Sequence, residues 1–334
     1  MNQLVSEPAS PEFLADYARQ SIRAGSKSFA GASALFDPAL KQSVQMLYAW
    51  CRHCDDVIDD QVLGFAAQPD SIQPGPIPAD PTRVQGRLAM LRDKTERALR
   101  GDVDEPAFAA LALVANRHGI PGRFAFELLD GFEMDAIGRR HLSLDDTIRY
   151  SYHVAGVVGI MMAMVMGARD DPTLDRACDL GIGFQLTNIC RDVMDDARIG
   201  RVYVPEQWLG LPPECSAHQA AAWVLDTSNT PTVLQTVARL LDQAERYYDS
   251  AYQGLNRLPV RAACAIATAR RIYRRIGREV RAGGEAALRE RVVVSRPRKL
   301  AGAVLGVVDA VTAHSLGRLH RVPRGADLWR RPGR

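Results

Sequence analysis

Apolar residues recur at intervals of three and four positions along almost the whole chain, and this spacing most restricts how it can fold. No segment alternates apolar and polar residues as a half-buried strand does. The spacing predicts helices over 13–23, 38–60, 83–99, 105–117, 123–136, 144–166, 173–198, 217–225, 232–255, 262–282 and 299–321. Turn signals separate them, as at Pro121-Gly122 and Leu258-Pro259. We therefore expect an all-α fold with a single helical domain over residues 1–322.

Two segments fall outside this pattern. Residues 65–81 contain five prolines and show no periodicity, which predicts a surface loop. Residues 323–334 contain four arginines against the single acidic residue Asp327, and we expect a disordered, basic tail. Such a tail can contact anionic lipid, whereas the lack of interleaved aromatic residues gives no support for a nucleic-acid partner.

The composition is that of an ordinary globular protein, with 47% hydrophobic residues, 24% charged residues and a net charge of +3. The N-terminus has no basic segment followed by an apolar one, and the six cysteines are scattered, so we expect a reducing, cytoplasmic location. The longest apolar run, 154–168, is shorter than the roughly 20 residues of a membrane-spanning helix. We interpret it as part of a buried core helix.

Two acidic clusters each place their polar residues on one face of a predicted helix. In the first, Tyr48, Arg52, Asp55 and Asp59 follow at steps of four, three and four residues. In the second, the steps are three, four and four, through Gln185, Asn188, Asp192 and Asp196. The remaining positions of both helices are largely apolar, which is not typical of solvated outer faces.

Carboxylates on half-buried helices repel one another unless a cation neutralises them. Oxygen ligands alone suit a hard ion, and Mg²⁺ commonly joins a few carboxylates to the phosphates of a substrate. A single D-x-x-x-D motif would more often be a surface patch, but two such motifs favour a magnesium site and a diphosphate substrate. The segment 25–29 adds a lysine and two hydroxyls, which fit either a diphosphate contact or a simple helix cap.

With these motifs, the chain resembles the squalene/phytoene synthase family, and within it most closely the bacterial phytoene synthases. The resemblance is carried by SKSF at 26–29, LYAWCRHCDDVIDD at 47–60, YSYHVAGVVG at 150–159, QLTNICRDVMDDARIGRVYVP at 185–205 and ARRIYRRI at 269–276. It covers most of the chain apart from the proline-rich loop and the tail. It implies the isoprenoid-synthase helical bundle around a central cavity.

The resemblance also implies roles for particular residues. Magnesium ligands are expected at Asp55, Asp59, Asp192 and Asp196. Contacts to substrate are expected from Ser26, Lys27, Ser28, Phe29, Arg52, Gln185, Asn188 and Arg191. Catalytic tyrosines are expected at Tyr48, beside the diphosphates or the metal, and at Tyr150 and Tyr203, near the reacting carbons.

The implied reaction is the head-to-head condensation of two geranylgeranyl diphosphates, through a cyclopropylcarbinyl diphosphate, to phytoene, the first committed step of carotenoid biosynthesis. Mg²⁺, with Mn²⁺ as a substitute, is the expected cofactor, and NADPH is not expected. A squalene or dehydrosqualene synthase that uses farnesyl diphosphate would share these motifs, and a helical membrane-surface protein without activity is the alternative from another class. Because the substrate and product are greasy, we expect peripheral membrane association, together with contacts to the upstream and downstream carotenoid enzymes.

Overall fold

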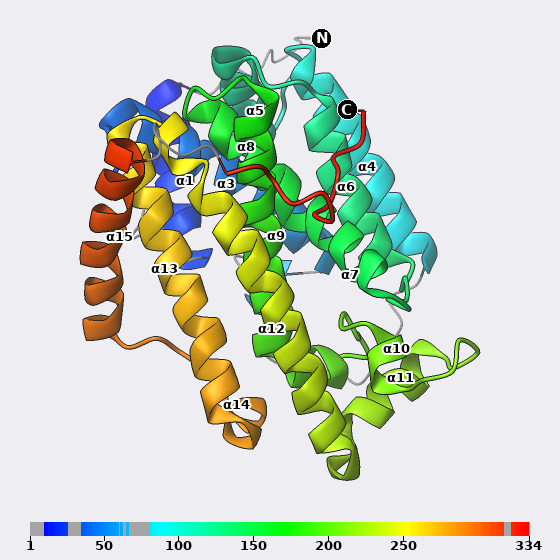
Figure 1. Cartoon of the computed structure of the whole chain (residues 1–334). Helices are drawn as coiled ribbons and strands as arrows, with labels where there is room; N and C mark the ends of the chain where they lie inside the picture. The colour runs from blue at the N-terminus through cyan, green and yellow to red at the C-terminus, as the bar shows by residue number, and fades with distance from the viewer. Residues whose placement is uncertain are drawn as a thin grey trace.

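The computed structural model describes residues 10–25, 35–59, 61–62, 65–66, 81–316 and 322–333. Long helices run side by side and make up nearly all of the structure (Figure 1). The first part of the chain forms α1 (Pro11–Gly25), α3 (Pro38–Asp59), α4 (Pro81–Leu99), α5 (Pro106–His118), α6 (Arg123–Ala136), α7 (Leu144–Ser151) and α8 (Val157–Val165). The second part forms α9 (Asp171–Arg198), α10 (Glu206–Leu209), α11 (Ala217–Leu225), α12 (Thr230–Tyr252), α13 (Val260–Gly283), α14 (Glu285–Arg289) and α15 (Arg296–Leu316).

The all-α prediction is confirmed, and the exceptions are small. Two strands of two residues each, β1 (Gln61–Val62) and β2 (Phe65–Ala66), pair antiparallel after α3. The loop predicted at 65–81 thus begins with β2 and ends at the first residue of α4, while 67–80 lie outside the described residues. Short 3₁₀ turns form at Thr227–Asn229 and Leu255–Arg257. They join α11 to α12 and α12 to α13.

The helix predicted over 144–166 is divided. A π-helical turn, η1 (Tyr152–Gly156), separates α7 from α8 without ending the helical path. Such turns accommodate one extra residue and are frequent near functional sites. The stretch Leu144–Val165 is long and apolar enough to cross a membrane by length and composition, yet 67% of its most apolar window is buried inside the protein. That burial agrees with the expected core helix.

Helix α9 is the central element, with α7, α8, α11, α12, α13 and α14 packed around it. It crosses the η1–α8 segment at backbone contact, because glycines stand at the crossing. A Cβ atom added to Gly181 would lie 2.2 Å from the carbonyl oxygen of Ala155, and one added to Gly159 would lie 2.4 Å from that of Ala177. The two glycines therefore set the distance between the helices.

The prediction of a disordered tail at 323–334 is wrong for residues 323–333, which pack against the bundle. Arg324 donates to both carboxylate oxygens of Asp179, at 2.9 and 2.7 Å, and Arg331 donates to Asp175 at 2.5 Å. The ring of Trp329 lies 5.7 Å from that of Tyr152. The basic composition suggested a solvated segment, but these arginines are the partners of aspartates that are buried on α9.

We expect Gly181→Ala to destabilise the protein by about 2–4 kcal/mol, because the added methyl group must push α9 away from η1. Thermal or urea unfolding followed by circular dichroism measures the change. Gly86→Ala on α4 is the matched control, since a Cβ atom there would meet nothing within 4 Å. It should leave stability unchanged or raise it slightly. Equal effects of the two substitutions would show that stability does not depend on the close contact between α9 and η1.

Candidate active site

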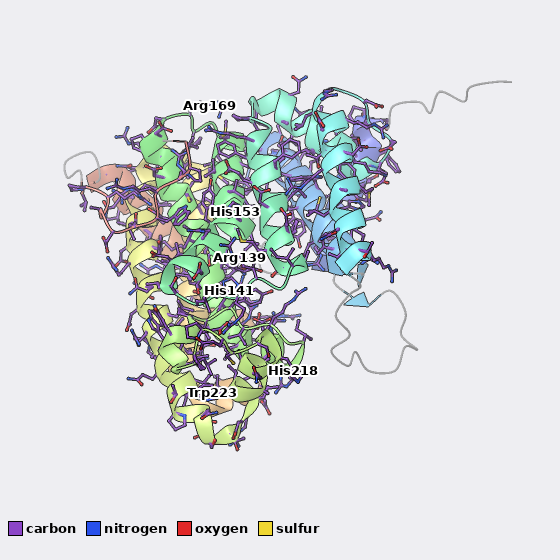
Figure 2. The ribbon with its side chains drawn as sticks, turned by 90° about the vertical axis from the view of Figure 1, so that its right-hand side faces the viewer. Arg139, His141, His153, Arg169, His218 and Trp223 are labelled. Carbon is purple, nitrogen blue, oxygen red and sulfur yellow. The ribbon has the colours of Figure 1, made fainter. Side chains whose placement is uncertain are left out.

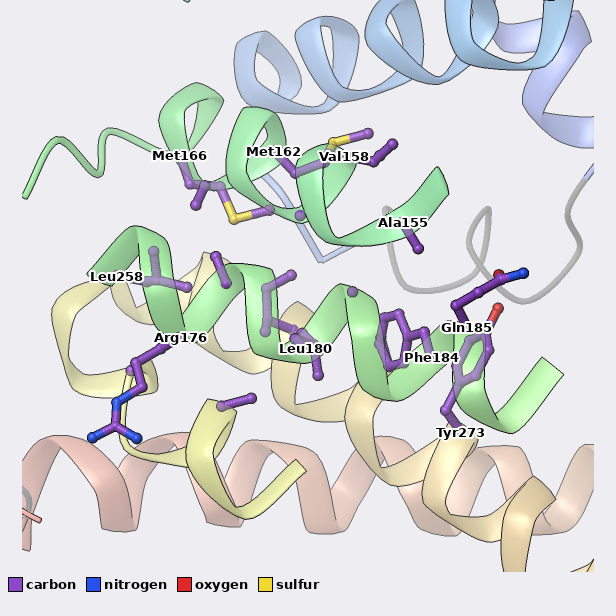
Figure 3. A pocket seen from close by; sticks show the side chains of 18 of the residues that line it. Ala155, Val158, Met162, Met166, Arg176, Leu180, Phe184, Gln185, Leu258 and Tyr273 are labelled. Carbon is purple, nitrogen blue, oxygen red and sulfur yellow. The ribbon is translucent and has the colours of Figure 1, made fainter. Parts of the chain in front are cut away.

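Side chains from η1, α8, α9 and α13 surround an apolar cavity of about 320 Å³. Its walls include Val158 and Met162 from α8, Leu180 and Phe184 from α9, and Ile272 from α13. Figure 3 shows Gln185 and Tyr273 at one end, and Met166, Leu258 and Arg176 at the other. The cavity is thus an elongated apolar space with polar groups concentrated at its ends.

Three of the predicted site residues line this cavity, namely Tyr48 from α3 and Gln185 and Asn188 from α9. The side-chain oxygen of Asn188 is buried and has no hydrogen-bond partner within the described structure. An amide oxygen left in this way is an unused ligand for a cation or a hydrogen-bond donor. Burial, partly offset by the charge of Arg52, raises the pKa of Tyr48 to about 12, so its hydroxyl stays protonated.

Beyond Asn188, the stripe on α9 continues with Asp192, which two arginines hold. Arg191 donates to it from Nε at 2.8 Å, and Arg291, which follows α14, donates at 2.9 and 3.0 Å. Burial by itself would raise the pKa of Asp192, but the hydrogen bonds from both arginines outweigh it and lower the pKa. Asp192 is therefore a charged carboxylate already surrounded by cations.

Asp196 lies one turn further on and differs sharply from Asp192. Burial, followed by the charge of Asp192, raises the pKa of Asp196 to about 8, although the charge of Arg201 opposes the shift. The structure records no hydrogen bond to its carboxylate within the described part of the chain. Two carboxylates one turn apart, with only one of them compensated, form a place where a cation would be strongly favoured.

The first acidic cluster is described only in part. Arg52 donates to Asp55 at 2.8 Å and pairs with Asp56 at 2.7 Å. The side chain of Asp59 and the segment Ser26 to Phe29, with Lys27 and Ser28, lie outside the described residues. In the described ranges, no three His, Cys, Asp or Glu side chains gather as a ready metal site. The four-carboxylate magnesium site therefore stays a prediction.

The two remaining catalytic candidates lie together and, unlike Tyr48, are not among the residues that line the cavity. The rings of Tyr150 and Tyr203 stack with centroids 4.7 Å apart, and their hydroxyls donate to the two carboxylate oxygens of Asp135, at 2.9 and 2.7 Å. Burial, followed by the charge of Asp135, raises the pKa of both tyrosines well above its ordinary value. The charge of Asp135 also contributes to the raised pKa of Asp196, so this trio lies close to the acidic stripe of α9.

His141 packs against both tyrosines of this trio. Its ring lies 5.1 Å from that of Tyr150 and 5.4 Å from that of Tyr203. Burial lowers its pKa to about 4, so the imidazole is neutral and serves as packing for the tyrosine pair. Figure 2 shows His141 and Arg139 between the main bundle and the smaller α10–α11 region, which carries His218 and Trp223. His153, in contrast, bonds to the backbone oxygen of Glu127.

Similarity to known proteins extends over most of the chain. The family described as squalene/phytoene synthase matches residues 22–298. The chain belongs to this family. A 15-cis-phytoene synthase of Enterobacter agglomerans is 50% identical over 314 residues, which cover 93% of this chain and 100% of that protein. A second one, from a Paracoccus species, is 48% identical and covers 94% of this chain and 96% of its own length.

Solved structures agree with the family. A crystal structure of a dehydrosqualene synthase superposes with a TM-score of 0.73 at 25% identity, covering 89% of this chain and 96% of that one. The squalene synthase HpnC of Alicyclobacillus acidocaldarius gives a TM-score of 0.65 at 21% identity, over 82% of this chain and 95% of that chain, and shows the fold alone. The expected isoprenoid-synthase helical bundle is thereby confirmed.

Sequence reasoning missed three residues that the structure brings to the site. Asp135 binds both tyrosines, Arg291 holds Asp192, and Tyr273 stacks on Phe184 with centroids 4.1 Å apart in the cavity wall. Tyr273 lies in the motif at 269–276, which marked the resemblance but had no role assigned. Asp135 belongs to neither acidic motif, and Arg291 is one of several basic residues between 289 and 299, so no spacing pattern singled them out.

We expect Asp196→Asn to stabilise the metal-free protein at alkaline pH. Because folding raises the pKa of Asp196 from 3.8 to about 8, its contribution is fully present below pH 4 and is lost as pH rises through 8. The neutral amide lacks this loss, and the expected gain near pH 8 is about 1–3 kcal/mol. Urea unfolding in EDTA from pH 5 to about 8 measures it.

Asp195→Asn provides the control for this experiment. Asp195 lies on the same helix but is 56% exposed and pairs with Arg198 at the surface. Its substitution should change stability by less than about 0.5 kcal/mol at any pH. If the free energies of unfolding of the wild-type and Asp196→Asn proteins depended on pH in parallel, the pKa of Asp196 would not be raised in the folded protein.

Proposed function

We propose that the chain condenses two geranylgeranyl diphosphates head to head, through a cyclopropylcarbinyl diphosphate, to give phytoene. The observation that carries the proposal is an elongated apolar cavity that ends at Gln185 and is also lined by Tyr48 and by Asn188, one turn before Asp192 on α9. A prenyl diphosphate has the matching shape, with a long hydrocarbon chain and a compact anionic head. The names of the relatives at 48–50% identity support phytoene as the product.

The residues of the second acidic stripe fit Mg²⁺. Asp192 and Asp196 offer carboxylate oxygens, and Asn188 offers an amide oxygen that has no other use within the described structure. Asp55 and Asp59 are the proposed ligands from α3. When bound, Mg²⁺ supplies positive charge that favours departure of the diphosphate. Mn²⁺ can substitute for it by the same ligand chemistry, and no NADPH is proposed.

Arg191 and Arg291 hold Asp192 and are the natural partners of a diphosphate. Guanidinium groups bind carboxylates and phosphates with the same bidentate geometry. Arg291 is 57% exposed and follows a short helix, so it can turn from Asp192 to an incoming anion at little cost in packing. Arg52, which is shared between Asp55 and Asp56, is placed to do the same from α3.

The cavity wall protects the carbocations that the reaction requires. Aliphatic side chains exclude water, which would otherwise capture an allylic cation. The stacked rings of Phe184 and Tyr273 lie in the wall and can stabilise passing positive charge through their π-faces. The wall also confines two chains side by side, which brings the reacting carbons together.

Asp135, Tyr150 and Tyr203 form a hydrogen-bonded group suited to moving a proton. Both hydroxyls donate to one carboxylate, so either tyrosine can pass a proton to Asp135 while it accepts another from the substrate. Tyr48 lines the apolar cavity and is assigned to cation stabilisation. The condensation ends with loss of a proton, and we assign that role to this group.

Peripheral contact with a membrane is a further part of the proposal. The product of the proposed reaction is a hydrocarbon with very low solubility in water, and the substrates are amphiphiles that partition into bilayers. Contacts with the enzymes that supply the substrate and consume the product follow from the same need to avoid water.

We expect Asp59→Asn and Asp192→Asn each to lower the Mg²⁺-dependent conversion of geranylgeranyl diphosphate by about 10²-fold or more, because each removes a charge that binds the metal. Purified protein is assayed in detergent, with extraction and chromatography of the hydrocarbon. EDTA should abolish product formation in the wild type. Asp195→Asn, which changes an exposed carboxylate of the same helix, should retain nearly full activity.

Undiminished product from both variants would refute the metal assignment. Farnesyl diphosphate supplied separately, with and without NADPH, tests the alternative of a squalene or dehydrosqualene synthase. A membrane-surface protein without activity would give no turnover with either substrate and no response to EDTA.

We expect Asp135→Asn to lower kcat by about 10²-fold with little change in KM, because the amide leaves the tyrosine hydroxyls without their shared acceptor. Glu127→Gln is the matched control on the same helix, where Glu127 accepts from Tyr152. Steady-state kinetics with geranylgeranyl diphosphate compares the two. Equal losses would mean that tyrosine–carboxylate pairs serve stability and not the reaction.

A further inference from the structure

Helix α15 exposes its large apolar residues and buries its small ones, which is the reverse of an ordinary surface helix. From 300 to 311, every exposed residue is apolar. The large side chains on this surface are Leu300, Val304, Leu305, Val307, Val308 and Val311, with Leu300 69% and Val304 60% exposed. We call these six residues the α15 face. At about 100° per residue they occupy one side of the helix.

The inner side of α15 consists of small residues and lies on α13. A Cβ atom added to Gly306 would lie 2.6 Å from the backbone nitrogen of Thr268, so the helices meet at backbone contact. Ala310 and Ala313 are buried in a small cluster with alanines of α13. Asp309 also points inward and accepts a hydrogen bond from Arg271 at 2.6 Å.

An amphipathic helix of a soluble protein buries its large apolar residues and exposes polar ones. In α15 the close contact with α13 admits only small side chains, and the large ones face outward. Figure 1 shows α15 at the edge of the bundle, with α13 between it and the other helices. Within the described residues, nothing covers the α15 face. A contiguous exposed apolar surface of this kind commonly marks an interaction site.

Basic residues stand at the N-terminal end of α15. Between 289 and 299 the chain has Arg289, Arg291, Arg296, Arg298 and Lys299 against the single acidic residue Glu290. Arg298 pairs with Glu279, whereas the described structure records no ion pair for Arg296 or Lys299. An apolar face with a cluster of positive charge at one end matches the acyl region and the phosphates of a bilayer.

The α15 face is one helix away from the apolar cavity. Ile272 of α13 lines the cavity and is the nearest side-chain neighbour of Gly302 on α15. The far end of the cavity is tied to α15 as well, since the ring of His314 contacts the backbone oxygen of Leu258 at 3.1 Å. In Figure 3, α15 is the salmon helix at the bottom, across α13 from the cavity.

The geometry points to α15 as the element that docks this chain on an anionic lipid bilayer, with its apolar face in the acyl region and Arg296 and Lys299 at the phosphates. The helix lies in the plane of the membrane, because its inner side is fixed along α13. This inference rests on the proposed function, which requires release of a hydrocarbon, and it assigns the surface involved.

Flotation of the purified full-length chain with vesicles tests the inference. Vesicles of phosphatidylcholine with phosphatidylglycerol are compared with vesicles of phosphatidylcholine alone, at low and high salt. We expect the wild type to float with the anionic vesicles, and we expect salt to weaken this binding. Val304→Asp/Val308→Asp should lower the bound-to-free ratio by roughly tenfold or more, and Arg296→Glu/Lys299→Glu should remove the preference for anionic lipid.

Met90→Asp places one such carboxylate at an exposed position of α4, away from the α15 face, and should float like the wild type. Circular dichroism confirms that each variant is folded. The inference is overturned if the wild type stays unbound, or if Val304→Asp/Val308→Asp floats as well as Met90→Asp. It is also overturned if the wild type is a dimer that the α15 variant converts to a monomer and does not float, since the face would then bind a second copy.

Turnover of geranylgeranyl diphosphate in detergent separates this inference from the proposed function. The α15 variants change no residue of the site, so they should retain wild-type turnover in detergent. Loss of flotation with full turnover supports the inference. Flotation of the wild type without any turnover would refute the proposed function and leave the α15 surface assignment in place.

Discussion

The cost of burying negative charge at the ends of two helices controls the arrangement of this site. Asp192 and Asp196 lie in the last turns of α9, and Asp55 and Asp59 lie in the last turns of α3. The C-terminal end of a helix already carries partial negative charge, so carboxylates there are unfavourable unless cations are close. Arg52, Arg191 and Arg291 supply part of that compensation. The raised pKa of Asp196 shows that the compensation is incomplete.

This charge stands next to an apolar cavity, and the two environments strengthen each other. Low polarity around the site makes each charge interaction stronger than it would be in water, both for a bound diphosphate and for a departing one. The backbone contact of α9 with η1 and α8 places the cavity and the acidic stripe on one rigid element. A prenyl diphosphate held through a cation at Asp196 would therefore have its hydrocarbon chain against the cavity wall that the same helix provides.

The sequence predicted what depends on local spacing. The all-α fold and the stripe Gln185, Asn188, Asp192 on α9 follow from 3.6 residues per turn, which needs no tertiary information. Asp135 and Arg291 could not be found in this way, because each reaches the site from a different helix region and only packing brings them there. The π-helical turn before α8 and the exposure of the α15 face were missed for the same reason. Periodicity shows that a helix has an apolar face but does not show what covers it.

The C-terminal segment shows how the same helix handles buried acid when no ligand is needed. Asp175 and Asp179 on the first half of α9 are almost completely buried, and each has an arginine of residues 322–333 as a direct partner. The sequence suggested a solvated tail because the arginines and their aspartates are 145 and 156 residues apart. On the second half of α9, Asp196 has no such hydrogen-bonded partner in the described structure, and its pKa rises instead. One helix thus contains both carboxylates that arginines of the same chain satisfy and a carboxylate whose burial is not compensated by a hydrogen bond in the described structure. Removing a partner from a buried charge is costly. Asp175 and Asp179 should therefore tolerate substitution only together with their arginines, whereas the effect of substituting Asp196 should depend on whether a ligand is bound.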